Sequence, residues 1–321
     1  MKLWELSGQS DQSSQENAAL RAVVINEMRG AAPMLNFAEF YQMTGNADTP
    51  LKAATATGGA SRAINADYST NKTAPAYGAI TLKILGDKIE TDIAYERRGP
   101  KGSLENERTR QLVTFSQALG RYLQDQMING ATSATDWDGL KAAIAAGQVL
   151  KCGGSTMVDG FKVALGNDNA AKESQQIFKE SVDELIASVI GGASCLIVPP
   201  KGISRMSTIG MQFVQKGSID AVFADQLGIY NGVPVVNAGY GKDGSTAVIP
   251  LTETLGGNTD CASFYAVRFG EKENVTFATN VGVQVKDLGL VTVLYTTLVD
   301  FDTDMVILNA KAAWRLQGIR L

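Results

Sequence analysis

Histidine is absent from the 321-residue sequence, and this absence excludes more chemistry than any other feature of the composition. Without histidine, the chain cannot form Ser-His-Asp or Cys-His nucleophilic sites, histidine-ligated zinc or a histidine general base. Cysteine is nearly as scarce, because only Cys152, Cys195 and Cys261 occur and they form no CxxC pair. We therefore expect neither a disulfide framework nor a thiolate metal site, and no cofactor is predicted.

Charge is also sparse. Charged residues make up 19% of the chain, below the ~25% usual for soluble proteins. The net charge is -4 and no block of Lys and Arg stands out, so tight nucleic-acid binding through phosphate neutralisation is not predicted, although weak contacts stay open. Glycine, by contrast, is abundant, with 33 residues. Few charges suit a chain that covers much of its surface with partners, since charge is depleted in interface cores; an ordinary glycine-rich globular protein is the alternative.

Long hydrophobic runs are missing as well. No run approaches the ~18 residues needed to span a bilayer, so no membrane partner is expected. The first residues, MKLWELSGQSDQ, lack the apolar region of a secretory signal, which favours synthesis in the cytoplasm.

Two helices dominate the first half of the sequence. Residues 15–29 carry an apolar stripe formed by Leu20, Val23, Val24 and Met28, and Gly30 and Pro33 end it. Residues 103–129 carry a longer stripe, and Asn129-Gly130 ends that helix; its apolar members are Leu104, Leu112, Phe115, Leu119, Tyr122, Leu123 and Met127. At 1.5 Å per residue the second helix is roughly 40 Å long, so it must lie across a flat layer or bridge two regions.

The stretch between these helices has little to pack. Residues 52–78 are rich in Gly, Thr and Ala and almost free of large apolar side chains, which is uncommon inside a compact domain. Alternating runs at 80–84 and 89–95 then predict strands. The two runs could form a tight hairpin on Gly86-Asp87. A long arm, running out along 52–65, turning near 66–76 and returning through 77–85, is preferred because it explains the under-packed stretch.

The second half has a mixed α/β pattern. We expect a helix at 173–191, a buried strand at 194–201 stopped by two prolines, and a helix at 203–217. Residues 230–251 predict a strand, a glycine-rich loop and a second strand, and a run of strands occupies 262–308. Trp314 and Leu316 are expected to anchor the end of the chain.

The order of these pieces resembles the major capsid proteins of tailed bacteriophages, which have the Hong Kong 97 capsid fold. The resemblance covers nearly the whole chain and rests on the following segments in order: the polar arm 1–30, APAYGAITLKILGDKIETDIAYERR (74–98), QALGRYLQDQMINGATSATDWDGL (117–140), SCLIVPPKGISRMSTI (194–209), YNGVPVV (230–236) and FDTDMVILNAKAAWRLQGI (301–319).

The resemblance implies an α+β fold with an N-terminal arm, an extended E-loop, a long spine helix, a peripheral domain and an axial domain. The implied boundaries are an arm at 1–33, a first peripheral part at 34–51, the E-loop at 52–85, the peripheral domain with its spine helix (103–129) at 86–149, the axial domain at 150–260, the peripheral sheet at 261–308 and a return to the axial domain at 309–321.

The implied function is structural. Pentamers and hexamers would close an icosahedral shell around double-stranded DNA, in a virion made in the cytoplasm of a bacterial host. Implied partners are further copies of the chain, a separate scaffolding protein if Met1 is retained in the particle, a portal, and a decoration protein as an open possibility. Some family members cross-link a loop lysine to a neighbour, which draws attention to Lys72. The candidate contact residues are Leu20, Val24, Lys72, Tyr77, Arg97 and Arg98.

Two motifs could instead suggest a ligand. GYGKDG (239–244) fits G-x-G-x-x-G, but a strand pattern follows where the dinucleotide fingerprint requires a helix, which favours a hairpin loop. Asp300, Asp302 and Asp304 alternate along a predicted strand and could hold Ca²⁺ or Mg²⁺. The glycine and distal glutamate of a calcium loop are missing, so pairing with Lys or Arg and a solvated face remain the alternatives.

Three other functions stay open. A cellular nanocompartment shell protein (an encapsulin) would have the same fold, although the long arm and loop favour the phage version. A non-shell binding module would leave residues 52–78 without a partner. An enzyme would have to use carboxylates, Lys, Ser or Tyr, and no pair of carboxylates flanks a recognisable cleft in the sequence.

Overall fold

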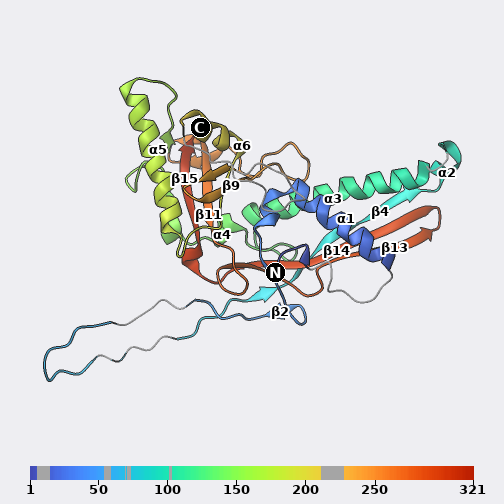
Figure 1. Ribbon diagram of the computed structural model, residues 1–321, viewed down its shortest axis with the longest axis horizontal. Helices are drawn as coiled ribbons and strands as arrows, with labels where there is room; N and C mark the ends of the chain where they lie inside the picture. Colours follow the sequence, from blue (N-terminus) through green and yellow to red (C-terminus); the bar gives the residue numbers. More distant parts are fainter. Residues whose placement is uncertain (6–14, 54–58, 69, 71–73, 101–102, 211–227) are drawn as a thin grey trace.

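The computed structural model describes residues 1–5, 15–53, 59–68, 70, 74–100, 103–210 and 228–321, with the side chains of 15–18 left aside. Its body contains two sheets, with two long helices lying along one of them (Figure 1). A third element, a long projection, leaves the body between two short strands (Figure 1). The predicted α+β class is confirmed.

The first sheet has five strands in the order β1-β12-β14-β13, with β4 also pairing with β14. Its members are β1 (Phe40–Gln42), β4 (Lys83–Asp92), β12 (Val275–Thr279), β13 (Val283–Val291) and β14 (Leu294–Ile307). β14 is central, since both β13 and β4 run antiparallel to it over most of its length. The three strands extend together to the right of the body in Figure 1.

The second sheet has eight strands, in the order β5-β15-β11-β7-β9-β8, with β10 on β11 and β6 on β15. They are β5 (Val149–Lys151), β6 (Phe161–Lys162), β7 (Cys195–Val198), β8 (Gly228–Tyr230), β9 (Val233–Asn237), β10 (Glu253–Leu255), β11 (Asn258–Val267) and β15 (Ala313–Arg320). Helices α5 (Asn169–Ser188) and α6 (Pro200–Thr208) lie against this sheet (Figure 1).

Helix α3 (Ser103–Asn129) has the predicted bounds, and helix α1 (Gln15–Ala31) packs against it. The two helices approach most closely at Gly120, where an added Cβ would lie 2.5 Å from the carbonyl oxygen of Met28. Gln117 on α3 also donates a hydrogen bond to Glu27 on α1, at 2.9 Å. Glycine at position 120 therefore lets one helix backbone rest directly on the other.

One hydrophobic core joins the two sheets. It takes Tyr265 and Val267 from β11, Phe277 from β12, Phe301 from β14 and Leu123 from α3, all buried. A second core fills the opposite face of the eight-stranded sheet, where Phe178 of α5 meets Phe264 of β11 edge-on, with ring centroids 5.8 Å apart. The eight-stranded sheet is thus covered on both faces, which explains why β11 reads as a continuous apolar run.

The predicted N-terminal arm does not extend from the body in its described parts. Leu3 is fully buried in the shared core, and the carbonyl of Met1 accepts a hydrogen bond from Phe40 N at 2.7 Å. Val24 is also fully buried, and Leu20 packs partly buried against the same core. The expectation that Leu20 and Val24 contact a neighbour is wrong for Val24, because the apolar stripe of α1 already packs inside its own chain.

Other features of the sequence patterns can be compared with the structure. The tight hairpin on Gly86-Asp87, the less favoured alternative, does not form, because β4 runs through both residues without a turn. The strands expected together at 261–308 divide between the sheets, since β11 lies between β7 and β15 in the eight-stranded sheet whereas β12, β13 and β14 belong to the five-stranded sheet. The helix expected at 203–217 corresponds to α6, which begins earlier and ends at Thr208; Gly210 then adopts φ +69°, and positions 211–217 lie outside the described residues.

Short elements complete the chain: β2 (Ala47–Asp48), β3 (Ile80–Thr81), α2 (Ala94–Arg98), α4 (Leu140–Ala143) and the 3-10 turns η2 (Pro33–Asn36), η3 (Ala146–Gln148) and η4 (Ala310–Ala312). Within the described ranges, no helix combines the length and apolar character needed to cross a membrane.

The Gly120 contact gives a test of the fold. Gly120→Ala should destabilise the protein by about 1–2 kcal/mol, because overpacking at a backbone contact outweighs the ~1 kcal/mol that alanine adds to a helix. Chemical denaturation measures the change. Gly147→Ala is the matched control, since nothing lies within 4 Å of its added Cβ, and we expect it to stay within about 0.5 kcal/mol of wild type. A Gly120→Ala chain as stable as wild type would contradict the close α1–α3 approach.

Candidate functional site

The most exposed feature is the projection, defined here as residues 49–79. Its described parts extend away from both sheets in Figure 1. The base is tied to the body, because Ala53 N donates to Leu308 O at 2.9 Å, and its two sides are joined to each other by Gly78 N donating to Pro50 O at 2.8 Å. Beyond the base the described side chains are exposed, and Ile64 is 91% exposed. Apolar side chains held so far from their own core are available to another molecule.

Tyr77 lies near the base of the projection, paired across it with Leu51 in an isolated bridge, and both side chains are 60% exposed. Its predicted contact role stays a prediction. Lys72 lies outside the described residues.

We call residues 47–48 and 80–83, which lead into and out of the projection, its stem. Three sets of polar contacts hold the stem. The buried Asp304 carboxylate accepts hydrogen bonds from Thr81 N at 3.0 Å and from Met305 N at 2.7 Å. The Lys83 ammonium donates to the carbonyls of Ser133 and Ala134, at 3.1 and 3.3 Å. The Tyr41 hydroxyl donates to Asp48 at 3.3 Å. Each contact joins the stem to an element distant in sequence or to the sheet, so the direction of the projection is fixed at its root.

A small hydrophobic cluster accompanies these contacts. It is separate from the two main cores and contains Tyr41, Met43, Ile80, Leu82 and Ala278, with Val306 packed against it. The stem therefore has its own apolar anchor on the edge of the five-stranded sheet.

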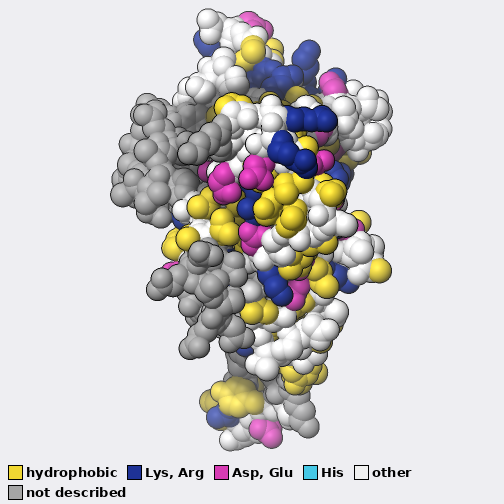
Figure 2. Space-filling model, turned by 90° about the vertical axis from the view of Figure 1, so that its right-hand side faces the viewer, with side chains coloured by type: hydrophobic (Ala, Val, Ile, Leu, Met, Phe, Trp, Pro, Cys, Tyr) yellow, Lys and Arg dark blue, Asp and Glu magenta, His cyan; other side chains and the backbone are white. Residues whose placement is uncertain are grey.

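A second exposed region lies where β13 turns into β14. Leu288, Leu290, Val291 and Val293 are each between 43% and 57% exposed. Figure 2 looks at this end of the molecule and shows hydrophobic side chains gathered in the middle of the face, among groups of Lys, Arg, Asp and Glu side chains. We call these four residues the aliphatic tip. A cluster of this kind on a hairpin marks a contact surface more often than an isolated exposed leucine does.

Arg97 and Arg98 lie at the end of α2, and both are exposed. The backbone joins this helix to the aliphatic tip, because Ile93 N donates to Val293 O at 3.0 Å. The two arginines and the tip therefore share one end of the molecule. The proposed role of the arginines in contacts between copies stays a prediction.

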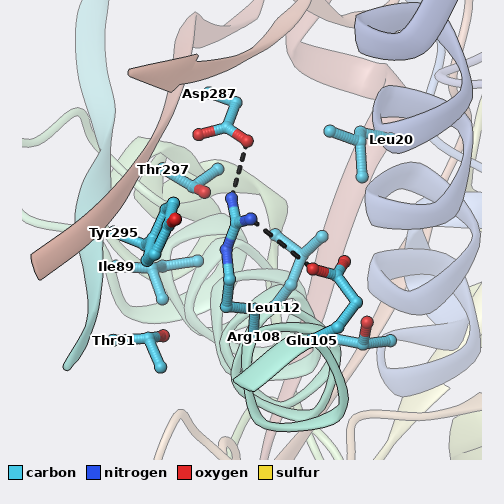
Figure 3. Close-up of a pocket in the computed structure, with 10 residues that line it drawn as sticks. Leu20, Ile89, Thr91, Glu105, Arg108, Leu112, Asp287, Tyr295 and Thr297 are labelled. Carbon is cyan, nitrogen blue, oxygen red and sulfur yellow. Dashed lines mark hydrogen bonds and ion pairs between the residues drawn. The ribbon is translucent and has the colours of Figure 1, made fainter. Parts of the chain in front are cut away.

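Arg108 fastens this end of α3 to the sheet, as Figure 3 shows. Its guanidinium donates to Asp287 of β13 at 2.6 Å, lies 3.6 Å from Glu105 on its own helix and stacks over the ring of Tyr295, 4.9 Å from the centroid. These side chains line a cavity of about 90 Å³ that Leu20 borders from α1. Leu20 therefore faces a pocket inside its own chain.

Two of the three aspartates of β14 have separate hydrogen-bond partners. Asp304 binds the stem, as described above, and Asp302 accepts a hydrogen bond from Asn280 at 3.0 Å. Burial and the nearby Asp302 charge raise the pKa of Asp300. Among the described residues no group of three or more acid, His or Cys side chains is placed to hold a metal ion. Of the alternating aspartates, Asp304 therefore holds the stem of the projection and Asp302 holds Asn280, which lies between β12 and β13.

The thiols are also enclosed. All three cysteines are buried, and burial raises the pKa of Cys152 and of Cys195 to about 12. A thiol with so high a pKa carries almost no thiolate at neutral pH, and the thiolate is the reactive form.

The GYGKDG motif belongs to a small hairpin, residues 239–248, that we call the clasp. Tyr240 pairs with Ala247, and Val248 N donates to Gly239 O at 3.1 Å. The Asp243 carboxylate closes the turn by accepting hydrogen bonds from the backbone and hydroxyl groups of Ser245 and Thr246. No helix follows the motif within the described chain, so the expectation of a hairpin loop is confirmed. The motif's glycines serve a turn beside α3.

With this geometry in place, the chain can be compared with known proteins. No protein-family model and no curated protein matches the sequence. Solved structures do match over most of the chain. The capsid of a native GTA particle has 12% sequence identity and a TM-score of 0.59, with 90% of each chain covered. The SrpI encapsulin of Synechococcus elongatus has 14% identity and a TM-score of 0.58, covering 89% of this chain and 87% of that one.

A structure from Mycobacterium phage Bobi matches as well, with 12% identity, a TM-score of 0.54 and 89% of each chain covered. The chain has the Hong Kong 97 capsid fold. The resemblance drawn from the sequence is therefore confirmed at the level of the fold.

Sequence reasoning missed the aliphatic tip and Arg108. The tip was visible as LGLVTV, most of which does belong to strand β13, but alternation alone did not show that this end of the hairpin is exposed. Arg108 gave no signal, because its partner Asp287 is 179 residues away in sequence.

The Asp243 turn gives a pH-dependent prediction. The hydrogen bonds from Thr246 and Ser245 hold the pKa of Asp243 well below its usual range. The ionised side chain therefore adds stability that is fully present above the unfolded pKa of ~3.9 and is lost as pH falls through the lower folded pKa. Asp243→Asn should lower the melting temperature at pH 7, and the difference from wild type should shrink between pH 4 and pH 2.

The control for this experiment is Asp67→Asn. Asp67 is an exposed aspartate on the projection whose carboxylate accepts one backbone hydrogen bond, from Tyr68. A pH-independent difference for Asp243→Asn, or an equal effect of Asp67→Asn, would contradict the role of the charge.

Proposed function

We propose that this chain is the major capsid protein of a tailed bacteriophage, which assembles through repeated contacts into pentamers and hexamers of a closed icosahedral shell around double-stranded DNA. The observation that carries the proposal is similarity over about 90% of the chain to shell proteins, including the GTA capsid. The structures that the chain resembles are shell proteins, which favours a structural rather than an enzymatic function.

The exposed features support self-association. The projection and the aliphatic tip lie at opposite ends of the molecule in Figure 1, and each exposes apolar side chains to solvent. In a shell, each would be covered by another copy. We propose that the projection is the E-loop, that α3 is the spine helix, that the five-stranded sheet belongs to the peripheral domain and the eight-stranded sheet to the axial domain.

The remaining partners are proposed on the same basis. A scaffolding protein, a portal and, as an option, a decoration protein would act with the shell, and the packaged DNA would be held by weak contacts, since the net charge of -4 offers no strong attraction to phosphate. The protein would be made in the bacterial cytoplasm and end in the virion.

A cellular nanocompartment is the second candidate, favoured by the match to the SrpI encapsulin. The contents of the shell separate the two. Particles that enclose nuclease-resistant DNA during infection would support the phage capsid, and particles that enclose a protein cargo would support the nanocompartment.

Assembly is the direct test. The purified protein, alone or co-expressed with a scaffold, should form closed particles or capsomer rings in electron microscopy, with matching light scattering. A monodisperse monomer under both conditions would refute a shell function and leave the fold as the only common property.

The aliphatic tip gives a sharper test. Replacing Leu290 and Val291 together by Ser should weaken assembly while leaving the monomer folded, because both side chains are about half exposed. Each lost apolar contact should cost about 1 kcal/mol, or roughly a fivefold drop in association per side chain. Leu165→Ser, which changes an exposed leucine elsewhere on the molecule, is the control. Unchanged assembly of the double variant would show that the tip is not a contact between copies.

A further inference from the structure

The clasp holds α3 at a point where the two halves of the molecule meet. It begins directly after β9 of the eight-stranded sheet, and Ala238 and Val248, which flank its turn, are buried in the shared core. Its three glycines lie beside α3. An added Cβ would lie 3.1 Å from Gln124 Nε2 at Gly239, 3.2 Å from Arg121 at Gly244 and 3.9 Å from Asp125 at Gly241.

Gln124 is the centre of this contact. It lies in the C-terminal half of α3, and its side chain is fully buried. Its Nε2 donates to the carbonyl of Ala238 at the start of the clasp, and its Oε1 accepts from Met34 N of η2 at 3.3 Å. Both ends of one buried amide are therefore used, and they bind backbone from two segments separated by about two hundred residues. A buried amide that lost these partners would be strongly unfavourable.

The contact continues along α3. The Asn129 amide donates to Val248 O at 2.6 Å and to Asp125 at 2.7 Å, and the Lys242 ammonium lies 5.7 Å from the centre of the Tyr122 ring. The clasp is thus bound at both ends by side-chain amides of the same helix. The apolar core around it is not directional, whereas these hydrogen bonds fix both the rotation and the height of α3.

We propose that Gln124 is a positioning residue which, with the clasp, forms a joint that couples α3 to the eight-stranded sheet, so that neither can shift without the other. The proposal has a second part, which rests on the proposed shell function. In an assembled shell, the joint sets the angle between the half of each subunit that contains the five-stranded sheet and the half that contains the eight-stranded sheet. That angle decides the curvature with which neighbouring copies meet.

The experiment compares Gln124→Met with Gln117→Met. Both changes replace a glutamine of α3 by an unbranched apolar side chain of similar length, but Gln117 binds only Glu27 of α1. Native-state hydrogen exchange of the full-length chain measures the joint. Gln124→Met should speed exchange in segments 238–249 and 34–38 by about tenfold, because Ala238 O and Met34 N lose their buried partner. Strand β12 should stay unchanged.

A different exchange pattern is expected if Gln124 contributes only to the overall stability of the fold. Exchange would then rise in all protected segments together through global unfolding, and this outcome, or no change at 238–249, would overturn the joint. If the Gln124→Met variant does not fold, the Asn129→Ser variant is measured in its place. Asn129 is exposed, and this substitution removes its side-chain hydrogen bonds to Val248 and Asp125. A smaller increase confined to 238–249 is then expected, and its absence would equally overturn the joint.

The diameter of assembled particles tests whether the joint affects the curvature of the shell. Where wild type forms closed particles, Gln124→Met should broaden or shift their diameters in electron microscopy, while Gln117→Met should not. Identical diameters would overturn the effect on curvature. A wild-type chain that forms no particles would refute the proposed function instead, and the exchange comparison would still decide whether the joint exists.

Discussion

Burial of one face of α3 is the constraint on which the rest of the structure depends. A helix of 27 residues is roughly 40 Å long, more than one small core can cover. The chain meets this demand with three different contacts along the helix. Arg108 binds the outer end to β13 and β14, Gly120 lets the backbone of α1 rest against the middle, and Gln124 binds the inner half to the clasp. The two sheets are placed by the same helix, because each contributes side chains to the core beneath it.

The chemistry of these contacts changes along the helix. The inner half is covered mainly by apolar side chains such as Leu119, Leu123 and Met127, whereas the outer end relies on Arg108 and on a hydrogen bond between Thr91 and Gln111. Apolar burial is not screened by dissolved ions, whereas a partly exposed ion pair such as Arg108–Asp287 is weakened by them. The outer end is therefore the part of the helix whose attachment depends most on solution conditions, and it lies next to the aliphatic tip.

Sequence patterns predicted elements well and their partners poorly. The spacing of the apolar residues from Leu112 to Met127 placed α3 correctly at both ends, because helical periodicity is a local property. The apolar stripe of α1 was equally clear. Such a stripe shows that one face of a helix is buried, but not which element buries it. Val24 was therefore predicted to contact a neighbouring copy, whereas it packs within its own chain. Membership of a sheet is also non-local. Nothing in the apolar run of β11 distinguishes a strand beside β7 from one beside β12. The GYGKDG turn was predictable from the strand-like pattern after it, although that segment pairs only through the isolated bridge of Ala247 with Tyr240. The place of the turn beside Gln124 was not predictable.

The position of β15 has a consequence for synthesis. This strand, Ala313–Arg320, follows β5, β7 and β11 in the sequence, yet it lies between β5 and β11 in the eight-stranded sheet. The ribosome releases the chain from its N-terminal end, so β5, β7 and β11 all emerge before the strand that joins β5 to β11. This part of the sheet therefore stays open until β15 has been synthesised. A chain that stopped before β15 would lack the strand with which both β5 and β6 pair, and it could not present the finished surface of the sheet.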